Sequence, residues 1–234
     1  MSAPPDKSPD RIAGMFDAIA PRYDLLNHVL SAGVDRRWRA RAIRSLGLTG
    51  GDTLVDVCAG TADVALQAHD AARVVGVDFA AVMLSVGQRK LRAAGEDRRI
   101  TLVRGDATRL PVRDGVADAA TVAFGIRNVE RPDLACAELA RVLRRGGRLA
   151  ILEFGVPRLP GISTLYLWYF RYLLPAIGRM ISGHTAAYSY LPASVGTFPP
   201  PPDFMVILEQ AGFADVRADP LTVGIVYLYT ATKG

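Results

Sequence analysis

Residues 55–66 read VDVCAGTADVAL: an apolar run around Asp56, a turn built on Ala-Gly-Thr-Ala, and an alanine-rich stretch. The run is typical of a buried strand and the stretch of a helix. A strand, a tight turn and a helix in this order form the elbow with which many proteins bind a phosphate or a nucleotide. Such elbows usually carry two or three glycines, whereas this one has only Gly60, with alanine at 59 and 62.

The alternation that begins at this elbow continues along the chain. It predicts strands at 53–58, 73–77, 100–104, 118–124 and 148–154, with helices at 62–70, 80–93 and 132–145. Strands that alternate with helices indicate a parallel sheet covered on both faces. A helical region at 10–46 precedes the sheet. It is followed by an aromatic-rich helix near 162–181, a proline-rich loop at 198–203, a short helix to 210, and strands at 214–218 and 224–231. We expect the last two strands to extend the sheet as an antiparallel hairpin.

Size and composition are those of one domain. The chain has 234 residues, of which 50% are hydrophobic, enough for a sizeable core. We expect a flexible tail at 1–12 and a single domain at 13–234, with a helical cap at 13–46 and a substrate-side insertion at 155–212. Because the two cysteines are far apart and no apolar window is long enough to span a bilayer, we expect a reduced, cytoplasmic protein. Arginine clusters at 35–44 and 95–100 indicate solvated helix faces, with a nucleic-acid-binding patch as the alternative.

Acidic residues stand near the ends of the first three predicted strands. They are Asp56, Asp78 and Asp106, and Asp78 follows Gly60 by 18 residues. In doubly wound sheets, ligands bind beyond the carboxyl ends of the strands, where Asp78 could accept hydrogen bonds from a ribose and Asp106 from an adenine amino group. One such residue alone is as readily a cap of a turn or helix. The three together favour an adenosine-containing cofactor.

The elbow distinguishes between adenosine cofactors. A dinucleotide site needs G-x-G-x-x-G so that the backbone can approach the pyrophosphate, and AGTADV lacks this pattern. S-adenosylmethionine has no phosphate and tolerates a bulkier turn. The sequence therefore favours S-adenosylmethionine and speaks against an NAD(P)-dependent reductase.

Several longer motifs resemble one family, the menaquinone/ubiquinone-biosynthesis C-methyltransferases. They are YDLLNHVLSAGVDRRWR, VDVCAGTADVAL, GVDFAAVML, RGDATRLPVRD, FGIRNV, RVLRRGGRLAILEF, SYLPASV and LTVGIV. The resemblance implies a Rossmann-like class I methyltransferase, an α/β fold with a doubly wound, mostly parallel sheet. It also implies methyl transfer from S-adenosylmethionine to a ring carbon of a polyprenylated quinol, with demethylmenaquinol expected first. A ubiquinone-pathway step and a small phenolic acceptor are the alternatives.

The resemblance also implies a set of cofactor contacts. With the strand-end acids, the expected cofactor-binding residues are Asp56, Gly60, Thr61, Asp78, Asp106, Ala107 and Ala123. Ala123 stands where many relatives have serine, and Ala62 where a second elbow glycine is usual. Ser189 replaces a usual arginine, and His184 lies near a common acid, so the departures at these two positions concern the acceptor.

Methylation of a ring carbon needs an electron-rich ring, which an ionised phenol supplies. The protein must align donor and acceptor, manage the phenolic proton and exclude water. The candidate catalytic residues are Arg127, Asn128, His184 and Tyr188. The alternative for Arg127 and Asn128 is a structural cap of a turn, and Tyr23 with Asp24 forms either a lid over the cofactor or a core contact. No metal is expected, because the three histidines show no ligand spacing.

The segment 162–182, ISTLYLWYFRYLLPAIGRMIS, indicates how an apolar substrate could arrive. Arg171 and Pro175 interrupt it, so we do not expect it to span a bilayer. An interfacial helix with Trp168, Tyr169 and Tyr172 at headgroup depth would give peripheral membrane contact. Packing against the sheet, or a dimer contact, is the alternative.

Overall fold

The computed structural model describes residues 6–157 and 186–234, with side chains up to 157 and from 190 onward. Its centre is a seven-stranded sheet of order β3-β2-β1-β4-β5-β7-β6. Neighbouring strands from β3 to β5 run parallel, and β7 pairs antiparallel with both β5 and β6. The strands are β1 (Thr53–Val57), β2 (Arg73–Asp78), β3 (Ile100–Arg104), β4 (Ala117–Ala123), β5 (Leu143–Phe154), β6 (Phe213–Leu221) and β7 (Val226–Lys233). The prediction of a doubly wound sheet with a C-terminal hairpin is confirmed.

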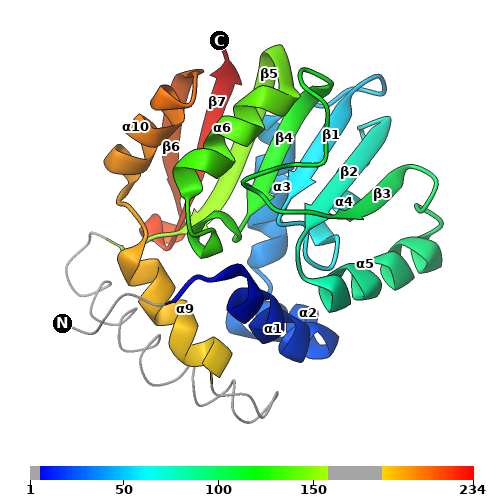
Figure 1. The fold of residues 1–234 in the computed structure, drawn as a ribbon, viewed down its shortest axis with the longest axis vertical. Coiled ribbons are helices and arrows are strands. Elements are labelled where there is room, and N and C mark those ends of the chain that lie inside the picture. The colour runs from blue at the N-terminus through cyan, green and yellow to red at the C-terminus, as the bar shows by residue number, and fades with distance from the viewer. Residues whose placement is uncertain (1–5, 158–185) are drawn as a thin grey trace.

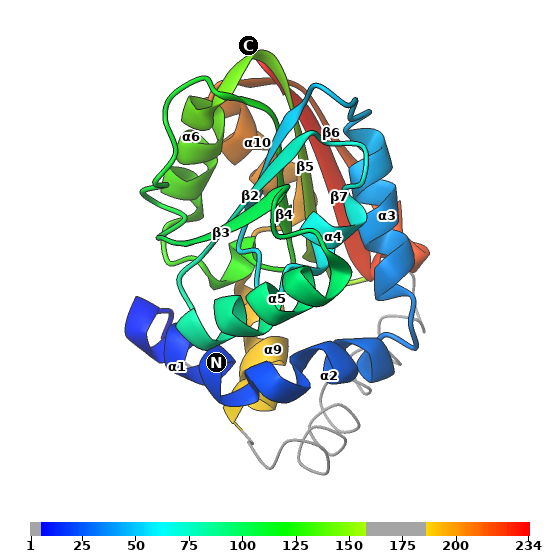
Figure 2. The same ribbon diagram turned by 90° about the vertical axis from the view of Figure 1, so that its right-hand side faces the viewer.

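Helices cover both faces of the sheet. Figure 2 shows α6 and α10 on one side of the sheet and α3 on the other. The helices of the two layers are α3 (Asp35–Ser45), α4 (Asp63–Gln67), α5 (Ala81–Ala94), α6 (Pro132–Val142) and α10 (Pro201–Gln210). Because both faces are buried, the strands are nearly continuous in apolar residues, which explains why the sequence shows apolar runs rather than alternation.

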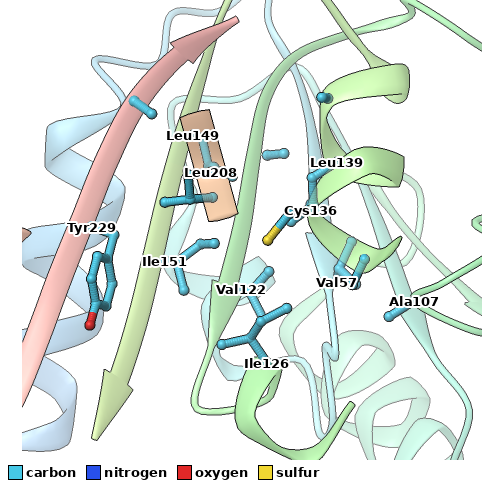
Figure 3. Packing of buried hydrophobic residues seen from close by; sticks show 14 of the residues in the cluster. Val57, Ala107, Val122, Ile126, Cys136, Leu139, Leu149, Ile151, Leu208 and Tyr229 are labelled. Atoms are coloured by element: carbon cyan, nitrogen blue, oxygen red, sulfur yellow. The ribbon is translucent and has the colours of Figure 1, made fainter. Parts of the chain in front are cut away.

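Successive strand residues point to opposite faces and join two separate cores. Val122, Ile151 and Tyr229 pack with Leu139 of α6 and Leu208 of α10 (Figure 3). Their strand neighbours Leu152 and Leu228 pack instead, together with Leu54 of β1, with Trp38 of α3 and Val64 of α4. This period of two is the geometry of a strand.

A helical cap lies below the carboxyl ends of the parallel strands. It consists of α1 (Pro9–Ile19), the 3₁₀ turn η1 (Ala20–Arg22), α2 (Tyr23–Leu30) and α9 (Ala186–Thr197), all at the lower end of Figure 1. Ala80 and Met83, at the start of α5, pack against Phe16 and Tyr23 of the cap. The cap therefore covers the edge of the sheet where a ligand is expected.

Some element boundaries differ from the predicted ones. Helix α6 ends at Val142 rather than 145, because Leu143 is already extended and pairs with Ala117 of β4. Helix α1 begins at Pro9, inside the expected tail, and Ile12 is fully buried. Helix α10 begins at Pro201 within the expected loop, since proline suits a first helical turn. No helix within the described ranges is long and apolar enough to cross a bilayer.

Candidate active site

A pocket opens between the carboxyl ends of the strands and the helical cap. The strand ends contribute Cys58, Gly60, Asp78, Asp106, Ala107, Ala123 and Asn128, and the cap side contributes Lys7, Pro9, Ile12, Phe16 and Tyr23. Five of the seven predicted cofactor-binding residues thus line one pocket. Asp56 and Thr61 do not line it.

The elbow between β1 and α4 adopts a left-handed backbone at three alternate positions. Cys58, Gly60 and Ala62 have φ of 57°, 54° and 67°. Only Gly60 adopts such values without a steric cost, and for other residues the cost is roughly 1–2 kcal/mol. Of the two alanines that depart from a glycine-rich elbow, Ala62 is left-handed and Ala59 is not, and Cys58 is a further non-glycine residue with this backbone.

Cys58 explains a glycine on the neighbouring strand end. A Cβ at Gly125 would lie 2.3 Å from Cys58 Cβ, so only glycine fits beside this elbow. Burial raises the pKa of the Cys58 thiol well above its usual range, and the nearby Asp78 charge adds to the effect. The thiol therefore stays protonated and forms part of the pocket wall.

Asp78 ties the elbow to the start of α5. One carboxylate oxygen accepts the Gly60 N–H at 2.8 Å and the other accepts the Ala80 N–H at 2.9 Å. Each oxygen can accept a further hydrogen bond, as a ribose diol would require. Burial raises the pKa of Asp78, and the backbone donors oppose this.

Asp106 and Ala107 form the pocket wall after β3. Asp106 Oδ1 accepts the Thr108 N–H at 2.8 Å and the Thr108 hydroxyl at 2.9 Å. Ala107 is buried, and Ala123 faces the same pocket from the end of β4. The absence of a hydroxyl at Ala123 leaves that part of the wall apolar.

Asp56 lies within β1, where its backbone pairs with Gly76 and Thr121. Its side chain is 1% exposed, and neither carboxylate oxygen has a hydrogen-bond partner. Burial first, and then the charge of Asp78, raise the pKa of Asp56 to about 8. The Ala65 N–H of α4 lowers the pKa of this carboxyl, but not enough to offset the effect of burial.

Thr61 faces the cap rather than the pocket. Its hydroxyl donates to Asp24 of α2 at 2.5 Å, and Lys90 of α5 donates to the other Asp24 oxygen at 2.7 Å. Lys90 also binds Asp63 at the start of α4. Asp24 thus fastens the cap to the elbow, while its neighbour Tyr23 lines the pocket.

Arg127 lies in the 3₁₀ turn η2 (Ile126–Asn128) and is buried in an ion pair. Its Nη1 lies 2.7 Å from Oε1 of Glu153, whose side chain is fully buried, and its backbone N–H donates to Glu153 Oε2 at 3.1 Å. The guanidinium also stacks over Phe154, 5.3 Å from the ring centroid. The positive charge of Arg127, a candidate catalytic residue, is therefore already balanced by a carboxylate.

Three buried polar atoms beside this ion pair have no partner in the described parts of the chain. They are Arg127 Nε, Asn128 Oδ1 and the Tyr190 hydroxyl. Tyr190 belongs to α9, which packs against η2, and its burial raises the pKa of its phenol. Because unpartnered buried polar groups are rare in proteins, these atoms indicate a position for polar ligand atoms.

Sequence reasoning did not identify four residues of this region. Lys7 and Cys58 line the pocket, Glu153 balances Arg127, and Tyr190 has a hydroxyl without a partner among the described residues. A charged residue inside the apolar run LAILEF was a signal for Glu153. Tyr190 stood in the motif that supplied Tyr188. Tyr188 lies on α9 with its side chain outside the described part, and His184 and the segment 162–182 lie outside the described residues altogether.

Comparison with known proteins shows the family to which this chain belongs. The model of the ubiE/COQ5 methyltransferase family matches residues 6–233. The chain belongs to this family. It is 48% identical to the ubiquinone/menaquinone biosynthesis C-methyltransferase UbiE of Syntrophotalea carbinolica, over 94% of this chain and 92% of that protein. It is 44% identical to the demethylmenaquinone methyltransferase of Mycolicibacterium gilvum, over 97% of both chains.

Solved structures with the same fold are much more distant in sequence. An S-adenosylmethionine-dependent methyltransferase from Thermotoga maritima matches with a TM-score of 0.66 at 18% identity, over 94% of this chain and 99% of that one. The [4+2]-cyclase SpnF matches equally well, with a TM-score of 0.67 at 18% identity and 99% coverage of both chains. A fold shared with a cyclase does not define the reaction, so the activity rests on the ubiE/COQ5 family and on the site.

Proposed function

We propose that this protein transfers a methyl group from S-adenosylmethionine to a ring carbon of a prenylated quinol, with demethylmenaquinol as the acceptor. The observation that carries this proposal is the family match over 6–233, together with relatives named demethylmenaquinone methyltransferase at 40% and 44% identity. A ubiquinone-pathway quinol is the second candidate, because relatives at 45–48% identity are named for both pathways.

The elbow side of the pocket suits the cofactor. The free acceptor positions of Asp78 would bind the ribose hydroxyls, and Asp106 with Ala107 would bind the adenine. The amino acid portion would extend along Gly60 toward the end of β4. Asp56 lies behind the elbow and does not line the pocket, so we do not expect its carboxyl to contact the cofactor directly.

The far end of the pocket suits the acceptor. A quinol hydroxyl there would donate to Asn128 Oδ1 and accept from both Arg127 Nε and the Tyr190 hydroxyl, which satisfies all three unpartnered atoms. The reacting carbon would then lie toward the elbow, where the methyl group is carried. Phe16 and Tyr23 of the cap would cover the two reactants and exclude water.

The reaction needs the reduced ring. As the phenolic proton leaves, electron density rises at the neighbouring ring carbon, which attacks the methyl group as its bond to sulfur breaks. Loss of the ring proton restores aromaticity. A quinone has no phenolic proton and an electron-poor ring, so it should not react.

The test uses labelled S-adenosylmethionine under anaerobic conditions. Demethylmenaquinol, a ubiquinol precursor and a simple phenol are offered separately, each with and without dithionite. We expect the label in menaquinol only when dithionite keeps the acceptor reduced. Equal labelling of quinone and quinol would refute the phenolate mechanism, and labelling of the simple phenol alone would refute the acceptor assignment.

A further inference from the structure

Lys7 brings an ammonium group to the pocket from outside the sheet. It lies in the segment just before α1, drawn in dark blue in Figure 1, and it lines the pocket together with Gly60, Asp78 and Asn128. The side chain is half-buried. A lysine in this setting is unusual, because lysine side chains normally keep the charged end in water.

No described carboxylate forms an ion pair with Lys7. Its neighbour Asp6 instead binds the Arg11 guanidinium at 3.2 Å and the Ser8 N–H at 2.9 Å. Lys90 differs in this respect, because it binds both Asp24 and Asp63. Lys7 is thus a partly desolvated cation that faces a cavity rather than a protein anion.

Three carboxylates line the pocket together with Lys7, those of Asp78, Asp106 and Glu130, and none of them forms an ion pair with it. Arg127 and Glu153 both act on Lys7 and neutralise each other in a buried ion pair. On the pocket wall, Arg131 binds Asp133 at 2.6 Å, and Asp78 is bound by two backbone N–H groups. The pKa of Lys7 is lowered, first by burial and then by the Arg127 charge, as expected for an ammonium without an anion beside it.

We propose that Lys7 binds an anionic oxygen of a ligand in this pocket. Lys7 would thereby supply the positive charge that Arg127 cannot supply, because Glu153 neutralises it. The inference rests on the proposed function, which supplies two such oxygens. One is the phenolate that forms on the acceptor, and the other is the carboxylate of the cofactor's methionyl group. Both present the same chemistry to an ammonium, a charge-assisted N–H···O hydrogen bond.

For the phenolate, Lys7 remains protonated throughout. The phenolic proton leaves to water, the ring carbon forms a bond to the methyl carbon, and the electron pair of the broken carbon–sulfur bond stays on sulfur as S-adenosylhomocysteine. The ring proton is then lost and the oxygen regains a proton, so the net reaction releases one proton. Lys7 stabilises the oxygen charge in the transition state and exchanges no proton.

The experiment compares three variants. Lys7→Met removes the charge with little change in length, and Lys7→Arg keeps it. Lys233→Met is the matched control, because Lys233 ends β7, which runs antiparallel to β5, and so lies at the opposite end of the sheet from the pocket. Thermal unfolding should show all three folded, since Lys7 has no ion pair to lose.

Two measurements distinguish the two oxygens. Calorimetry with S-adenosylmethionine and with methylthioadenosine, which lacks the aminocarboxypropyl chain, tests the carboxylate. If Lys7 binds the cofactor carboxylate, Lys7→Met should weaken S-adenosylmethionine binding about 10- to 100-fold and leave the affinity for methylthioadenosine unchanged. If Lys7 binds the phenolate, Lys7→Met should leave cofactor affinity unchanged and lower the turnover of demethylmenaquinol at saturating cofactor by a similar factor. Lys7→Arg should keep most of the wild-type turnover.

If Lys7→Met matches Lys233→Met in both measurements, the proposal is wrong. If the wild-type protein methylates no quinol, the proposed function fails. The role of Lys7 is then tested by cofactor binding alone. An unchanged affinity of Lys7→Met for S-adenosylmethionine overturns the proposal, and an affinity loss for S-adenosylmethionine but not for methylthioadenosine supports it.

Discussion

The two ends of the pocket are built in different ways. The elbow side, formed by the ends of β1, β2 and β3, is shaped mainly by backbone: three left-handed positions, and an Asp78 carboxylate held by two N–H groups. The acceptor side, formed by η2, the end of β5 and α9, consists of side chains: the Arg127–Glu153 ion pair and three unpartnered polar atoms. The elbow side is therefore largely complete without a ligand, whereas the acceptor side has buried polar groups without a partner among residues 6–157 and 186–234. The predictions below test this contrast.

The largest effect is expected from Glu153→Ala on the acceptor side. The substitution leaves the Arg127 guanidinium buried without its carboxylate, which should lower the free energy of unfolding by about 3–5 kcal/mol. For a protein of this size, thermal unfolding should shift by roughly 6–20 °C. As a control, Arg144→Ala breaks the exposed pair with Asp118 and should cost less than about 1 kcal/mol. A double variant, Arg127→Met with Glu153→Leu, should regain most of the loss; a loss as large as in Glu153→Ala would show that the pair is not what stabilises this end.

Asp56, on the elbow side, has a buried carboxyl with a raised pKa, so its contribution to stability depends on pH. Because its pKa is raised to about 8, the folded protein keeps a proton that the unfolded chain releases near pH 4. This contribution to stability is full at low pH and is lost as the pH rises from about 4 to 8. Asp56→Asn should therefore stabilise the ligand-free protein at pH 8, on the order of 2–4 kcal/mol, and by much less at pH 4. Urea unfolding across this range measures the difference, and parallel curves for the two proteins would contradict it.

Asp78→Ala should weaken cofactor binding about 10- to 100-fold, because it removes the ribose acceptor and frees the N–H groups of Gly60 and Ala80. Calorimetry with S-adenosylmethionine measures this loss. Asp106→Ala, at the exposed wall after β3, should have a smaller effect. An unchanged affinity in Asp78→Ala would remove the ribose assignment.

Tyr190→Phe tests the acceptor side without disturbing its packing. The hydroxyl has no partner within the described residues, so its loss should change the free energy of unfolding by less than about 1 kcal/mol. Cofactor affinity should also hold, while turnover of the quinol falls. Normal turnover would mean that the hydroxyl does not contact the acceptor.

The smallest effect is expected at the elbow itself. Ala62→Gly relieves the left-handed strain of roughly 1 kcal/mol but loses a buried methyl group and adds freedom to the unfolded chain. These terms nearly cancel, so stability should change by less than about 1 kcal/mol. Ala65→Gly removes an equally buried methyl from α4, where no strain is relieved, and should cost more. Equal losses for the two variants in chemical unfolding would show that Ala62 carries no strain.

The contrast also explains what the sequence could predict. Gly60, Asp78 and Asp106 each follow their own strand, and a parallel sheet brings its strand ends to one edge, so local patterns place them correctly. Glu153 meets Arg127 across 26 residues, and Lys7 and Tyr190 approach the pair from opposite ends of the chain. No local pattern encodes such encounters. For the same reason the ion pair of Arg127 could not be predicted, because its partner Glu153 lies in the otherwise apolar run LAILEF of β5.

The pocket wall formed by the first helix has a practical consequence for expressing and labelling the protein. Lys7, Pro9 and Ile12 lie on that wall, so an affinity tag or fluorescent protein fused close to the amino terminus would be attached beside the bound reactants. The carboxyl terminus lies at the opposite end of the sheet, beyond β7 (Figure 1). Affinity tags, immobilisation sites and reporter dyes are therefore better attached after Gly234. Removal of the first dozen residues would expose the pocket to solvent, because it removes Lys7, Pro9 and Ile12 from the pocket wall.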